Sequence, residues 1–122
     1  MLRHGPIGCN LDMDSPGARS GFLELTHSSN QFAFSVIQIP IAVIANGNGL
    51  TVLLTGGNHG DEDEGQLICR MLREAIAPED ISGRIIFMPA LNMPAVLARQ
   101  RVSPLDEGNM NRAFPGDSAG GP

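Results

Sequence analysis

One short segment of the sequence holds residue types that bind a transition metal. In residues 56–62, GGNHGDE, His59 and Glu62 stand three positions apart. An imidazole and a carboxylate at this spacing can converge on one ion and suit Zn²⁺, which in catalytic sites commonly takes two His, one Glu and a water. Because the segment is acidic and the chain contains no lysine, a Gly-rich phosphate site is disfavoured. The segment therefore predicts a cation site.

The same segment is open to a structural interpretation. Asn58 could cap a following helix, and the acidic residues 61–64 could complement the positive end of its dipole. A single His-x-x-Glu pair is a weak signal, so these residues alone leave both interpretations open.

The elements around the segment predict a βαβ unit. Residues 50–55 and 84–88 are apolar on both faces, which is typical of central, buried strands. Between them, residues 62–76 repeat apolar side chains at helical spacing. These side chains are Leu67, Ile68, Met71, Leu72 and Ala75. The candidate ligands then lie at the carboxyl end of the first strand, where open α/β sheets bind their ligands.

A β-rich stretch precedes this unit. Residues 32–44 favour a strand, and Pro40 within them indicates a sheet edge or a bend, because proline cannot donate to a ladder. Two Asn-Gly pairs at 46–49 predict a hairpin turn into the strand at 50–55. The predicted fold class is α/β, with a β-hairpin followed by a βαβ unit.

Composition excludes several classes of protein. The 122 residues include 8 basic residues, all arginine, 13 acidic residues and 5 Phe, with no Trp or Tyr. Without a basic cluster or stacking aromatics, nucleic-acid binding is disfavoured. No run approaches the ~18–20 apolar residues that cross a membrane, and no secretory signal is visible. Cys9 and Cys69 lack CxxC spacing and are expected to be free thiols of a cytoplasmic protein.

Two separated motifs resemble those of a known enzyme family. Residues 55–65, TGGNHGDEDEG, look like the first zinc motif of the succinylglutamate desuccinylase/aspartoacylase family, whose members are relatives of the zinc carboxypeptidases. Residues 101–116, RVSPLDEGNMNRAFPG, resemble the second block of that family. The Ser-Pro-Leu-Asp run is most similar to the subgroup that deacetylates N-α-acetyl-L-2,4-diaminobutyrate in ectoine breakdown. The likeness covers nearly the whole chain, with the two motifs in the family's order.

The resemblance implies a role for each matching residue. His59 and Glu62 match the first two zinc ligands, and Asn111 and Arg112 match the pair that binds the substrate carboxylate. Arg101 matches the arginine that polarises the scissile carbonyl. The chemistry agrees, because a guanidinium binds carboxylates through a planar fork and stabilises an oxyanion as a fixed positive charge.

Some of these residues have milder structural alternatives. Asn111 could serve a turn, and each arginine could be a solvated surface charge. For Asn109, shaping the turn after Gly108 stands beside a functional role.

The resemblance also implies that residues 1–122 are the N-terminal portion of a single zinc-hydrolase catalytic domain, with a partial zinc-carboxypeptidase-like sheet whose C-terminal part is missing. In the family the third zinc ligand, a His, and the general-base Glu lie downstream of the second motif, and His4 and His27 match neither. We expect a zinc-dependent amide hydrolase acting on an N-acylated amino acid, with this chain carrying part of the site. The alternative is a catalytically inactive fragment or a small binding module that retains the motif; a downstream His and Glu would discriminate between the two.

The resemblance implies an N-acyl amino acid as a small-molecule partner, and the predicted strands indicate a second partner, another copy of this chain. Residues 50–55 and 84–88 require helices on both sides of the sheet, whereas one long helix is predicted. We therefore expect an exposed apolar sheet edge and self-association through it.

Overall fold

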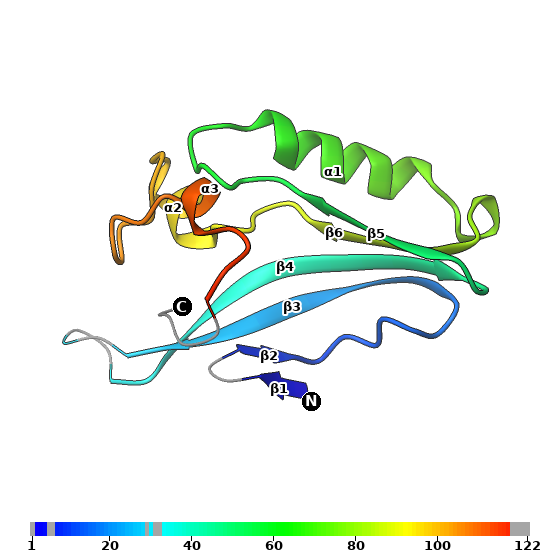
Figure 1. Cartoon of the computed structure of the whole chain (residues 1–122), viewed down its shortest axis with the longest axis horizontal. Coiled ribbons are helices and arrows are strands. Elements are labelled where there is room, and N and C mark those ends of the chain that lie inside the picture. Colours follow the sequence, from blue (N-terminus) through cyan, green and yellow to red (C-terminus); the bar gives the residue numbers. More distant parts are fainter. Residues whose placement is uncertain (1, 5–6, 29, 31–32, 118–122) are drawn as a thin grey trace.

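The chain folds as one mixed β-sheet with a long helix, α1, packed beside its last two strands (Figure 1). The computed structural model describes residues 2–4, 7–28, 30 and 33–117. The strands are β1 (Leu2–His4), β2 (Ile7–Cys9), β3 (Gly17–His27), β4 (Ser35–Asn46), β5 (Leu50–Thr55) and β6 (Gly83–Met88). The helices are α1 (Glu64–Ala75), the 3-10 turn η1 (Pro78–Asp80), α2 (Met93–Ala98) and α3 (Met110–Ala113). Across the sheet the strand order is β1-β2-β3-β4-β6-β5.

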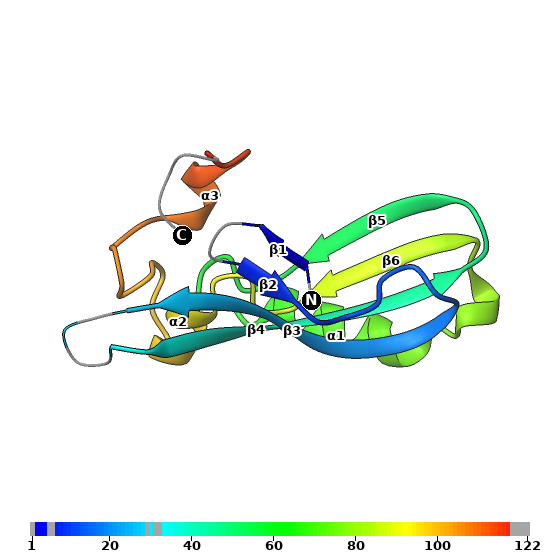
Figure 2. The same ribbon diagram turned by 90° about the horizontal axis from the view of Figure 1, so that it is seen from below.

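The predicted βαβ unit is confirmed. β5 and β6 pair in parallel, with Leu50 opposite Gly83 and Thr55 opposite Met88, and α1 lies between them in the chain. Both strands therefore end at the same edge of the sheet. Figure 2 shows α2 and α3 gathered at that end, where the candidate site is expected.

The strand order corrects two expectations. β6 lies between β4 and β5, so the turn at 46–49 joins strands that are not neighbours, and the antiparallel pairs before the βαβ unit are formed by β1 to β4. Within the described part of the chain β5 is an edge strand, with Leu50 84% and Leu53 56% exposed. A strand that is apolar on both faces is expected to be covered on both faces of the sheet. The pattern does not indicate whether the strand pairs with one neighbouring strand or with two.

β4 passes through Pro40 without interruption, and Pro40 is paired in register with Phe22 of β3. The ladder between β4 and β6 begins only at Ala42. At Pro40 the strand is therefore a local edge, as predicted, because the missing N–H costs no bond to β6.

α1 contacts the sheet through a different face from the one that its apolar spacing predicts. Its buried residue is Cys69, which packs in one cluster with Ala42, Ile44 and Phe87. The predicted apolar stripe is exposed instead, with Met71 67% exposed. The helical period was correct, but the surface that this stripe covers is not supplied by the described residues.

Two simpler expectations can be compared with the structure. Cys9 and Cys69 are both free thiols, as predicted. Among the helices that the structure describes, none is long and apolar enough to cross a membrane.

Candidate functional site

The loop between β5 and α1, residues 56–63, is fastened to the segment that follows β6. Gly60 N donates to Gln100 O at 2.8 Å, which ties the loop to the end of α2. A Cβ atom on Gly60 would lie 1.9 Å from Ala95 O, so only glycine permits this close approach. The loop is therefore held at the carboxyl ends of β5 and β6.

Asn58 does not cap α1, which corrects the structural interpretation of the loop. The N-cap position of α1 is occupied by Asp63, whose side chain makes no capping hydrogen bond. Asn58 Nδ2 instead donates to Asn111 Oδ1 at 2.9 Å, and its carbonyl oxygen accepts from Asn92 Nδ2 at 3.4 Å. Asn58 thus connects the first motif to the second.

The two predicted zinc ligands face each other. His59 Nδ1 lies 3.0 Å from Glu62 Oε1. His59 is buried, with 2% of its surface exposed, whereas 55% of the Glu62 side chain is exposed. The imidazole is held inside the loop while the carboxylate stays open to an approaching ion.

The donor set and spacing of this pair fit a shared cation. Two ligands of a tetrahedral zinc ion, each about 2.1 Å from the metal, lie about 3.4 Å apart. The observed separation of 3.0 Å differs from that value by a few tenths of an ångström. Over the residues described, no group of three or more His, Cys, Asp or Glu side chains could hold a metal ion. The described residues therefore supply two zinc-type ligands.

Arg101 meets the same carboxylate oxygen. Its Nη1 donates to Glu62 Oε1 at 3.0 Å. The hydrogen bond with His59, and then that from Arg101, hold the pKa of Glu62 below its usual value. Glu62 is therefore ionised at neutral pH, as a carboxylate ligand must be to bind a metal.

α3 carries the predicted substrate-binding pair. Asn111 is tied to the first motif through Asn58, whereas the Arg112 side chain is exposed and has no hydrogen-bond or ion-pair partner in the described part of the chain. The structure thus brings together four of the five predicted residues in one chain of contacts. Arg112 lies on the same short helix, with its guanidinium available to a ligand.

Two asparagines hold the site together through contacts that the sequence analysis does not predict. From the sequence, Asn58 could cap a helix, and Asn109 could either shape a turn or have a functional role. Asn109 Oδ1 lies 3.0 Å from His59 Nε2, a contact between residues 50 positions apart. The position of Asn109 two residues before Asn111 could have suggested a cap for α3, but no local pattern points to His59.

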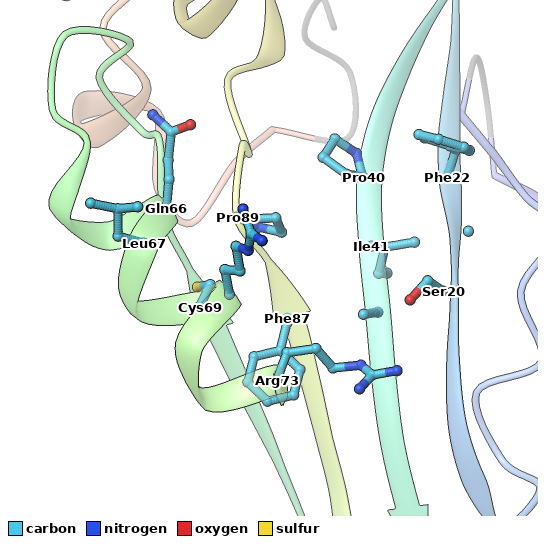
Figure 3. A pocket seen from close by; sticks show the side chains of 13 residues that line it. Ser20, Phe22, Pro40, Ile41, Gln66, Leu67, Cys69, Arg73, Phe87 and Pro89 are labelled. Carbon is cyan, nitrogen blue, oxygen red and sulfur yellow. The ribbon is translucent and has the colours of Figure 1, made fainter. Parts of the chain in front are cut away.

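A separate hollow of about 580 Å³ lies between α1 and the β3–β4 side of the sheet (Figure 3). Its lining is mostly apolar and includes Phe22, Ile41, Cys69 and Phe87. Arg73 extends from α1 beside it, and its buried Nε has no hydrogen-bond partner among the described residues. None of the five predicted site residues lines this hollow.

Comparison with known proteins identifies relatives over nearly the whole chain. Residues 48–122 match the succinylglutamate desuccinylase/aspartoacylase catalytic domain. The N-alpha-acetyl-L-2,4-diaminobutyric acid deacetylase of Halomonas elongata is 45% identical over 118 residues, which are 97% of this chain and 34% of that protein.

Solved structures agree with this match. The product-bound ectoine utilization protein EutE (DoeB) from Ruegeria pomeroyi superposes with a TM-score of 0.88 at 45% identity, covering 98% of this chain and 37% of that one. A succinylglutamate desuccinylase/aspartoacylase from Rhodobacter sphaeroides gives a TM-score of 0.86 at 45% identity, covering 95% and 36%. The chain therefore spans about a third of the length of the relatives that it matches.

Proposed function

The chain belongs to the succinylglutamate desuccinylase/aspartoacylase family, whose catalytic domain matches residues 48–122, and from this premise we propose that it forms part of a zinc-dependent deacylase. The reaction proposed is hydrolysis of the amide bond of an N-acylated amino acid. N-α-acetyl-L-2,4-diaminobutyrate, or a close analogue met in ectoine breakdown, is the proposed substrate, since a deacetylase of that name is 45% identical. Residues 1–122 would supply the N-terminal portion of the catalytic domain, with the third zinc ligand and the general base contributed from outside this segment.

One observation carries the proposal. Glu62 Oε1 lies 3.0 Å from both His59 Nδ1 and Arg101 Nη1. A buried imidazole, an ionised carboxylate and a guanidinium at one point supply two zinc-type ligands and a fixed positive charge beside them. If these residues served only as the N-terminus of α1, the contacts of Glu62 with His59 and Arg101 would not be needed.

The residues of the chain have distinct tasks in this reaction. His59 and Glu62 would hold the zinc ion, which when bound supplies Lewis acidity that polarises an amide carbonyl and lowers the pKa of water. Arg101 presents N–H donors beside Glu62 and stabilises the negative charge that develops on the carbonyl oxygen. Asn111 and Arg112 orient the substrate by binding its carboxylate, the latter through the planar fork of its exposed guanidinium.

Acyl release tests the proposed function. A version of the chain extended to the length of its relatives is expected to release acetate from N-α-acetyl-L-2,4-diaminobutyrate in a zinc-dependent reaction, faster than acyl groups are released from N-acetylaspartate or N-succinylglutamate. The 122-residue chain is expected to show no turnover, because hydrolysis needs both a firmly held metal and a base for the water proton. Chelator-treated protein is the control.

Two outcomes of this assay would contradict the proposal. Zinc-dependent hydrolysis by the 122-residue chain, lost in Glu62→Ala, would show that its site is complete. Binding of N-acyl amino acids by the longer protein without hydrolysis of any of the three would favour the alternative, an inactive binding module built on Asn111 and Arg112.

We also propose that the 122-residue chain self-associates through the exposed edge of β5. The edge strand exposes Leu50 and Leu53, and α1, which contacts β5, exposes Met71. Leu53→Lys is expected to weaken the association at least tenfold in sedimentation equilibrium, because a charge blocks edge-to-edge pairing. Leu97→Lys, an equally drastic change at an exposed leucine of α2, should leave it unchanged. A wild-type chain that stays monomeric at every concentration would refute the proposal.

A cytoplasmic location is proposed from the state of the thiols. Cys9 and Cys69 are both free, which suits a reducing compartment. Burial raises the pKa of the Cys69 thiol and so keeps it unreactive.

A further inference from the structure

The three residues that follow α2, at positions 99–101, each bind the loop between β5 and α1. Position 100 does so through its backbone carbonyl, whereas positions 99 and 101 do so through guanidinium groups. The three contacts are Gln100 O with Gly60 N, Arg99 with Asp63, and Arg101 with Glu62. Because Glu62 and Asp63 are neighbours in the chain, the two arginines bind adjacent carboxylates.

The contact between Arg99 and Asp63 is bidentate. Arg99 Nη1 donates to Asp63 Oδ1 at 2.5 Å, and Nη2 donates to Oδ2 at 3.0 Å. The two side chains are 62% and 50% exposed, and an exposed ion pair contributes little to stability. Two parallel hydrogen bonds nevertheless fix the relative orientation of two planar groups. The Asp63–Arg99 pair therefore orients the two segments more than it stabilises the fold.

The backbone of Arg99 is a second sign that its side chain matters. Its φ is +55°, in the left-handed region, at the C-terminal end of α2. Helices commonly end in a left-handed glycine, because a Cβ atom is unfavourable in this conformation. Glycine would suit the backbone here but would lack the guanidinium. A strained conformation persists where its surroundings support it, and the bidentate contact with Asp63 provides such support.

We propose that Asp63 and Arg99 are positioning residues, whose bidentate contact fixes the place of the Arg101 guanidinium beside Glu62. This assignment rests on the proposed function, because it takes Arg101 as the group that stabilises the carbonyl oxygen. In the described part of the chain, Arg101 meets Glu62 through one nitrogen, which does not by itself define the plane of the guanidinium. The neighbouring pair restricts the backbone from which Arg101 extends. Such restriction matters, since a misplacement of about 1 Å can cost about a hundredfold in rate.

Turnover of the protein extended to the length of its relatives tests this role. Asp63→Asn is expected to lower kcat about tenfold and to leave KM within about twofold of the wild type. Arg99→Gly is expected to lower kcat equally, while Tm stays near the wild-type value, because relief of the left-handed backbone offsets the lost contact. The double variant should lose no more than either single variant, since both remove the same contact.

The matched control is Glu74→Gln, which breaks the exposed, single-bonded pair of Arg70 and Glu74 within α1 and should leave kcat unchanged. Asn is as good an N-cap residue as Asp, so Asp63→Asn should not weaken the start of α1. Unchanged kcat in both single variants would overturn the assignment, as would losses that add in the double variant.

Amide exchange in the metal-free 122-residue chain supplies a measurement that does not depend on turnover. Asp63→Asn and Arg99→Gly are each expected to speed the exchange of Gly60 N–H, which donates to Gln100 O, about tenfold or more. Exchange of Ile76 N–H, at the far end of α1, should not change. An unchanged Gly60 rate in both variants would refute the positioning role. A wild-type protein of full length that hydrolyses no N-acyl amino acid would instead refute the proposed function, while Gly60 would still show whether the pair positions residues 99–101.

Discussion

Replacing Glu62 with alanine is expected to abolish zinc-dependent hydrolysis in a version of the chain extended to the length of its relatives. Glu62 Oε1 is the atom at which His59 Nδ1 and Arg101 Nη1 meet, each at 3.0 Å. The substitution removes one of the two proposed metal ligands and also releases Arg101 from its position. Loss of about 4 kcal/mol of binding free energy corresponds to about a thousandfold weaker zinc affinity, and we expect at least that decrease in chelator competition.

The matched control for this substitution is Glu64→Ala. It removes the same charge two positions away, from an exposed residue in the first turn of α1 that contacts neither His59 nor Arg101. Zinc affinity and turnover should stay within about twofold of the wild type. Equal losses in both variants would mean that overall charge matters and that Glu62 is not a ligand; an unchanged Glu62→Ala protein would contradict the assignment directly.

Gly60→Ala is expected to destabilise the fold more than any other single-methyl change in the loop between β5 and α1. The added Cβ would lie 1.9 Å from the carbonyl oxygen of Ala95 and 2.0 Å from its carbon, and both are backbone atoms of α2. Neither side can yield easily, because Gly60 N is bonded to Gln100 O. We expect a loss of about 3 kcal/mol or more in the free energy of unfolding.

Thermal unfolding measures this effect, with an expected fall in Tm of about 10 °C or more. Gly47→Ala is the control, since Gly47 has a φ of +64° and nothing within 4 Å of an added Cβ. That substitution should cost only the penalty of a left-handed conformation, about 1–2 kcal/mol. If Gly60→Ala melts no lower than Gly47→Ala, the close contact between the loop and α2 is not present in solution.

Much of the local structure could be predicted from the sequence. The βαβ unit follows from two apolar runs and a helical repeat between them, each of which is a property of neighbouring residues. The pairing of His59 with Glu62 is local as well, because three positions on one tight loop leave few other arrangements. Arg101 and Asn111 could be assigned only through their resemblance to a family, since their partners lie 39 and 53 positions away.

The sequence by itself therefore determined the βαβ unit and the closeness of His59 and Glu62 at its turn, because periodicity and spacing act over a few residues. Only the tertiary structure decided that β6 lies between β4 and β5 and that the apolar stripe of α1 stays exposed. It also decided that Asp63, and not Asn58, occupies the N-cap position of α1, and that Asn109 caps α3 and contacts His59. Hydrophobic patterns reveal which face of an element is apolar, yet they do not specify which distant segment covers that face. That choice depends on how the whole chain closes, and a contact across 50 positions leaves no trace in either local pattern.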